Sequence, residues 1–86
     1  MTSIEYTAHA LARMTERGVS RAQVEAVLTT AWRTRAAAQG RIEVQGLIER
    51  GDRPMLLRVI VERNSVVSVV VTVIATSKIG KYGADP

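Results

Sequence analysis

Hydrophobic and polar residues follow two different periods along the chain, and the change falls near Gly40. Before it, apolar residues recur every three or four positions, as at Ala10 and Met14, which is the spacing of a helix with one buried side. After it, apolar and polar residues alternate, as in strands with one buried face. The pattern predicts two helices followed by three strands.

Capping residues indicate where the helices begin and end. Thr7 can cap a first helix that runs to about Arg17, and Gly18 is the residue type expected just past its end. Ser20 is followed three places later by Gln23, which is the spacing of a capping box. We therefore expect a second helix from residue 21 to about residue 31 or 32.

The three expected strands lie in RIEVQGL, PMLLRVIVE and VVSVVVTVIA. The linkers ERGDR and RNS are too short for crossovers, so the strands should form an antiparallel meander with the helices on one face. The predicted fold class is α+β, in the order ααβββ. A chain of 86 residues is too short for two cores, so we expect a single domain over residues 1–86.

Side chains alternate across a strand, so each face of the last strand can be predicted. The residues expected to face the helices are Val67, Val69, Val71 and Val73. Thr72 should point to the other side, together with Arg58. The apolar residues expected on this second face are Leu56, Ile60, Val70 and Ile74. That is more apolar surface than a monomer normally exposes, so a partner should cover it.

The chain carries twelve Lys and Arg against eight Asp and Glu, a net charge of +4, and ten of the twelve are arginine. Guanidinium groups bind phosphate through a rigid fork, so this charge favours a polyanionic partner such as RNA. Tyr6, Trp32 and Tyr82 are too few aromatic residues to stack several bases. The chain has no cysteine, no signal-peptide pattern and no apolar run of membrane-spanning length, so we expect a cytoplasmic protein without a membrane partner.

His9, Arg13 and Arg17 are spaced four residues apart and should form a line along the first helix. One interpretation is structural: the side-chain stems lie along apolar surface, and Glu16 pairs with Arg13. The other is a phosphate site that contains a proton carrier. We predict the second, because folding and docking of the helix do not require this alignment.

Residue content excludes several kinds of chemistry. One histidine, no cysteine and scattered acidic residues cannot supply a zinc or iron site or a two-metal nuclease, so we expect neither a metal nor another cofactor. No Gly-rich loop precedes Lys-Ser or Lys-Thr, which excludes nucleotide hydrolysis. Metal-independent cleavage of RNA stays open, because the 2′-OH of the substrate supplies the nucleophile.

Two segments, HALARMTERGVS and VVVTVIATSKIGKY, resemble the signatures of a small bacterial family, domain of unknown function 4258. The resemblance spans Tyr6 to Tyr82 and implies a relationship to the RelE and BrnT toxin folds, which cut RNA without a metal. Related domains also occur at the tips of polymorphic toxins. The aromatic residue usual after the last Thr-Val pair is Ile74 here. The family motif marks His9, Arg13, Arg17, Thr72, Ser77, Lys78 and Tyr82.

The resulting hypothesis is a toxin-type, metal-independent ribonuclease whose partners are RNA and an antitoxin or immunity protein. The candidate catalytic residues are His9, Arg13, Arg17, Arg58, Thr72 and Tyr82. The candidate RNA-binding residues are Arg41, Ser77, Lys78 and Lys81. The alternative is a non-catalytic basic module that binds RNA, an antitoxin or immunity partner, or a second copy of itself through the half-apolar sheet face.

Overall fold

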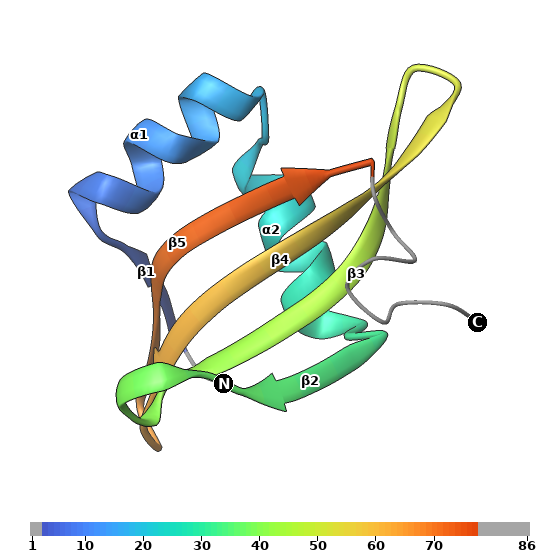
Figure 1. The fold of residues 1–86 in the computed structure, drawn as a ribbon. Helices are drawn as coiled ribbons and strands as arrows, with labels where there is room; N and C mark the ends of the chain where they lie inside the picture. The colour runs from blue at the N-terminus through green and yellow to red at the C-terminus, as the bar shows by residue number, and fades with distance from the viewer. Residues whose placement is uncertain (1–2, 78–86) are drawn as a thin grey trace.

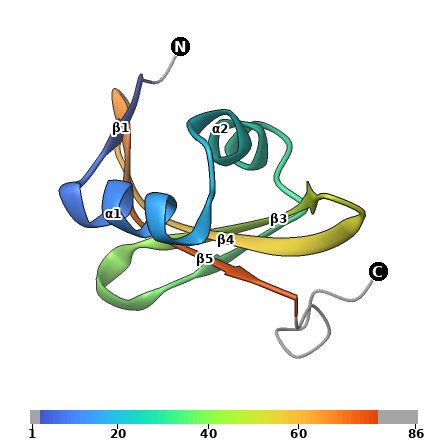
Figure 2. The same ribbon diagram turned by 90° about the horizontal axis from the view of Figure 1, so that it is seen from above.

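A five-stranded sheet carries both helices on one of its faces (Figure 1). The structure, a computed structural model, describes residues 3–77. Its elements in chain order are β1 (Ser3–Tyr6), α1 (Ala8–Arg17), α2 (Arg21–Thr29), β2 (Arg33–Ala36), a 3-10 turn (Ala38–Gly40), β3 (Ile42–Arg50), β4 (Arg53–Arg63) and β5 (Val67–Thr76). Figure 2 shows α1 and α2 on the same side of the sheet.

The expected three-stranded meander is wrong, because the sheet has five strands in the order β1-β5-β4-β3-β2. β1 pairs with β5 in parallel and β2 pairs with β3 in antiparallel orientation, so the sheet is mixed. Both added strands have only four residues, too few for alternation to distinguish a strand from a loop. The class is still α+β.

The predicted helix caps are confirmed. The Thr7 hydroxyl accepts a hydrogen bond at the start of α1, and Gly18 closes the helix in the left-handed conformation with φ of 66°. Ser20 and Gln23 form both hydrogen bonds of the capping box at the start of α2. α2 ends at Thr29, slightly earlier than expected. Among the described residues, no helix is long and apolar enough to cross a membrane.

A β-bulge at Val71 reverses the faces of β5. On one side of it Val59 pairs with Val73, and on the other Val61 pairs with Val70, so Val71 has no partner on β4. Both Val70 and Val73 therefore lie in the core.

The prediction for the faces of β5 is consequently right only beyond the bulge. Val73 faces the helices, and Thr72 lies on the opposite face with Arg58. Val67 and Val69 face away from the helices, because they precede the bulge. Val70, expected on the second face, is buried in the core instead. The run of identical valines contains no local sequence signal that would predict the position of the bulge.

Thr7 joins the bulge to α1. Its hydroxyl accepts a hydrogen bond from the Ala10 N–H and donates one to the Val71 carbonyl, both at 3.0 Å. Its own N–H donates to the Val70 carbonyl at 3.0 Å. One residue thus caps the helix, binds a carbonyl that the bulge removes from strand pairing, and places the start of α1 over β5.

The core lies between the helices and one face of the sheet. α2 approaches β3 closely at Gly46, where an added Cβ would lie 3.0 Å from Cγ2 of Val27, so a larger residue would push the helix away. The buried core residues are Ala10, Met14, Val19, Val24, Val27, Val44, Ile48, Leu57, Val59, Val61, Val70 and Val73.

We predict that Thr7→Val lowers the free energy of unfolding by about 1–2 kcal/mol, because it removes the helix cap and leaves the Val71 carbonyl without its hydroxyl donor. Thr7→Ser keeps the hydroxyl and should lose much less. Urea denaturation of the two variants and the parent measures the difference. Equal stability of the valine and serine variants would show that the hydroxyl does not hold the bulge.

Candidate nucleic-acid interface

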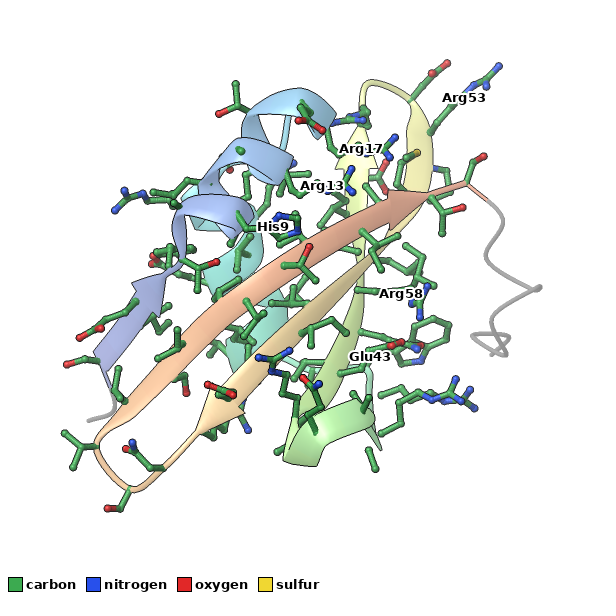
Figure 3. All side chains as sticks on the ribbon, turned by 60° about the vertical axis from the view of Figure 1, so that its left-hand side comes forward. His9, Arg13, Arg17, Glu43, Arg53 and Arg58 are labelled. Carbon is green, nitrogen blue, oxygen red and sulfur yellow. The ribbon has the colours of Figure 1, made fainter. Side chains whose placement is uncertain are left out.

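His9, Arg13 and Arg17 form a line, here called the α1 stripe, on the surface beside the buried side of α1 (Figure 3). Figure 3 shows His9, Arg13 and Arg17 in a line along one side of α1. His9 and Arg17 are exposed, and the side chain of Arg13 keeps 42% of its accessible surface. The stripe is therefore open to a ligand along its whole length.

The charges of the stripe are weakly compensated. Arg13 Nη1 lies 3.5 Å from Glu16 Oε1, so the pair that the structural interpretation requires is present, but it is long and solvent-exposed. Within residues 3–77, neither His9 nor Arg17 forms a hydrogen bond or an ion pair. An imidazole and two guanidiniums are thus available to bind an anion.

The structure adds two arginines at one end of the stripe. Arg50 and Arg53 are paired directly across the turn that joins β3 to β4. The Arg50 guanidinium lies against Gly18, where an added Cβ would meet Nη2 at 2.9 Å. Figure 3 shows Arg53 at the tip of this hairpin.

Sequence reasoning missed both arginines. The segment RGDR did contain a signal for their pairing, because the two-residue turn Gly-Asp places the arginines on either side of it opposite each other. The contact of Arg50 with Gly18 at the end of α1 depends on tertiary packing, which the segment does not encode.

Arg58 lies in a different environment, on the face of the sheet away from the helices. Its Nε and Nη2 donate to the two carboxylate oxygens of Glu43 at 2.8 and 2.9 Å, a bidentate pair. Glu43 is 5% exposed, and the Arg58 side chain is 18% exposed. The charge of Arg58 is therefore largely neutralised by Glu43.

The hydrogen bonds from Arg58 hold the pKa of Glu43 below its usual 4.5. Burial acts in the opposite direction, and a hydrogen bond from Gln45 Nε2 lowers the pKa further. Gln45 is fully buried, and its Oε1 has no hydrogen-bond partner within residues 3–77. These three residues form a buried polar cluster whose geometry favours a carboxylate at neutral pH.

The remaining predicted site residues do not join the α1 stripe. Thr72 shares the helix-free face with Arg58. Arg41, the residue before β3, pairs with Glu62 at 3.2 Å. Ser77 is exposed after the end of β5. Lys78, Lys81 and Tyr82 lie outside the described residues. The structure thus divides the candidate set between two faces of the sheet.

Tyr6, the last residue of β1, is held by contacts with α2. Its hydroxyl donates to Glu25 at 2.9 Å, and the Arg21 guanidinium lies 5.0 Å from its ring centroid. Burial, followed by the interaction with Glu25, raises the pKa of Tyr6 to about 12. The ring is therefore not free to stack on a base.

Two shallow hollows lie at the other end of the sheet. Both include Arg63 and Asn64, their volumes are about 330 and 280 Å³, and neither contains a residue of the α1 stripe. Among residues 3–77, no three His, Cys, Asp or Glu side chains group as metal ligands do. The stripe is an open cationic surface, which suits an extended polyanion better than a small enclosed ligand.

A small α+β domain with a basic helix edge is the class of protein that these features define. The chain belongs to the family described as Domain of unknown function (DUF4258), which matches residues 6–78. The expected family membership is thereby confirmed. Searches of curated proteins and of solved structures give no match.

We predict that Glu43→Gln lowers the free energy of unfolding by about 2–3 kcal/mol near neutral pH, because Arg58 loses its buried counter-charge. The pKa of Glu43 is lower in the folded state than in the unfolded state. Its ionised form therefore stabilises the fold fully above the unfolded pKa, and this contribution is lost as the pH falls through the folded pKa.

The stability difference between the parent and Glu43→Gln should accordingly shrink between about pH 7 and about pH 3 in urea denaturation. Glu62→Gln, whose side chain keeps 54% of its accessible surface, is the matched control and should change little. A gap that stays constant over this pH range would contradict the assignment of an ionised Glu43.

Proposed function

We propose that this protein is a toxin-type, metal-independent endoribonuclease that binds and cleaves RNA along the α1 stripe. One observation carries the proposal: His9, Arg13 and Arg17 are aligned and accessible, and among residues 3–77 Arg13 alone of the three forms an ion pair, which is long. The family resemblance, which implies a relationship to the RelE and BrnT toxin folds, supports the same function.

The chemistry needs no group beyond RNA and these side chains. The 2′-oxygen attacks the adjacent phosphorus, and the bond from phosphorus to the 5′-oxygen breaks. This leaves a 2′,3′-cyclic phosphate and a free 5′-hydroxyl. A base must take the proton of the 2′-OH and an acid must protonate the leaving oxygen, which are transfers that an imidazole can make.

Arg13 and Arg17 have the complementary task. The nonbridging phosphoryl oxygens gain negative charge as the phosphorus becomes five-coordinate, and guanidiniums placed beside them stabilise that charge. We prefer this pair to Arg58, because Arg58 Nε and Nη2 already donate hydrogen bonds to Glu43. We therefore assign transition-state stabilisation to Arg13 and Arg17, proton transfer to His9, and no catalytic role to Arg58.

The helix-free sheet face supports a second candidate function, a non-catalytic interaction module. Leu47 and Ile74 on this face are 50% and 36% exposed. Arg58 on this face is already neutralised by Glu43. An antitoxin, an immunity protein or a second copy could therefore cover the face and leave the α1 stripe uncovered on the other side of the sheet. An interaction module of this kind would bind its partner but would leave RNA intact.

We predict that purified protein cleaves single-stranded RNA in the presence of EDTA and leaves an all-DNA strand of the same sequence intact, because only RNA supplies the 2′-OH. His9→Ala and Arg13→Ala should each lower the cleavage rate by about 100-fold or more. Both should unfold within about 0.5 kcal/mol of the parent, since neither residue is in the core.

Arg63→Ala is the matched control, because it removes an exposed arginine from the far end of β4 and should keep full activity. Induction of the same variants in a susceptible host, followed by growth and total RNA, gives the cellular test. Unchanged cleavage by both His9→Ala and Arg13→Ala would refute the site. If the parent protein cleaves RNA in no assay but forms a stable complex through the sheet face, the interaction module is favoured.

A further inference from the structure

Arg50 and Arg53 form a second cationic group that the catalytic proposal does not use. They are opposite each other on antiparallel strands, where side chains share one face and Cβ atoms lie about 5 Å apart. Both are exposed, and within residues 3–77 neither forms an ion pair or a hydrogen bond. Like charges in this position destabilise a hairpin, so folding alone does not explain the pair.

The acidic residues of the hairpin do not relieve this repulsion. Glu49 precedes Arg50 and is paired with Pro54, so it points to the opposite face of the sheet. Asp52 lies in the turn and makes no ion pair with either arginine. The helix-side face of the hairpin therefore carries two uncompensated positive charges.

Arg50 is also held in a defined place at the end of α1. Its guanidinium fills the space beside Gly18, which a Cβ would otherwise occupy. The C-terminal end of a helix carries partial negative charge, so a cation is favoured there. This contact accounts for the position of Arg50, but it does not account for Arg53, which is at the hairpin tip in Figure 3.

The two arginines continue the line of the α1 stripe. Arg17 is the last residue of α1 and precedes Gly18, so Arg17, the Arg50 guanidinium and Arg53 follow one another from the helix end to the hairpin. Successive stripe residues rise about 6 Å along the helix, a step similar to the spacing of phosphates in an extended strand. The result is a cationic track from His9 to Arg53.

We propose that Arg50 and Arg53 bind the phosphates of single-stranded RNA next to the nucleotide that the α1 stripe holds. The choice of RNA rests on the proposed function. Arginine suits this role, because its fork binds phosphate oxygens in pairs. A single strand is favoured over a duplex, because A-form geometry holds the 2′-OH out of line with the leaving oxygen. The contacts read no base, so binding at this group is independent of sequence.

The test measures binding without cleavage. A fluorescein-labelled, fully 2′-O-methylated RNA strand cannot be cut through its 2′-oxygen, so fluorescence anisotropy reports affinity alone. We expect Arg53→Gln and Arg50→Gln each to weaken binding about three- to tenfold at moderate salt. Each should also reduce the slope of log affinity against log salt by about 0.7, the value for one phosphate contact on a single strand.

Arg63→Gln is the matched control. It removes the same charge from the other end of β4 and should leave both the affinity and the salt slope unchanged. Arg53→Gln should also unfold at the same or a higher temperature than the parent, because it relieves the repulsion between opposed arginines. Weaker RNA binding in a variant that is no less stable separates a binding role from a structural one.

Three results would overturn the inference. Equal losses for Arg53→Gln and Arg63→Gln would mean that only net charge matters. Unchanged RNA affinity for both hairpin variants would show that Arg50 and Arg53 do not bind RNA. Unchanged RNA affinity with weaker binding to a polyglutamate peptide would make the hairpin a site for an acidic protein instead.

Failure of the proposed function gives a different result. In that case the parent protein binds the methylated RNA through Arg50 and Arg53 but leaves ordinary RNA uncut. Conversely, normal cleavage and an unchanged KM in Arg53→Gln would refute the track and leave the ribonuclease assignment intact.

Discussion

The hydrogen bonds of Thr7 connect the two halves of this fold. The bulge at Val71 turns Val70 and Val73 to the same side of β5, so both valines lie in the core. The bulge also leaves the Val71 carbonyl outside strand pairing, and the Thr7 hydroxyl binds it while capping α1. Thr7 lies two residues before His9, so its hydrogen bonds also fix the direction in which the α1 stripe faces.

Local signals predicted the helices well, because their ends depend on residues only a few positions apart. Thr7, Gly18 and the Ser20–Gln23 box each form the expected cap. Strand positions depend on distant partners. β2 is fully exposed and is a strand only because β3 lies beside it, and β1 is identified by its pairing with β5. The bulge could not be predicted, because every residue from Val69 to Val71 is a valine.

The candidate site was partly visible in the sequence for the same reason. Four-residue spacing on a helix fixes which side chains share a face, so the alignment of His9, Arg13 and Arg17 follows from their numbers alone. The bond from Arg58 to Glu43 joins neighbouring strands through side chains on one face, and this depends on register. Arg50 at the end of β3 contacts Gly18 at the end of α1, two residues far apart in the chain, and no local pattern predicts this contact.

The distribution of charge distinguishes arginines that stabilise the fold from arginines available to bind RNA, a distinction that the sequence alone did not give. On the helix-free face the buried Glu43 neutralises Arg58, and the low exposure of both residues makes this pair part of the sheet's own structure. On the helix side, Arg17, Arg50 and Arg53 have no carboxylate partner among residues 3–77. Tyr6 is occupied by Glu25 and Arg21, and Trp32 lies next to β2, at the opposite edge of the sheet from β1. Under the proposed function, affinity would therefore come from phosphates rather than stacked bases, and the choice of RNA would depend on which strands are accessible.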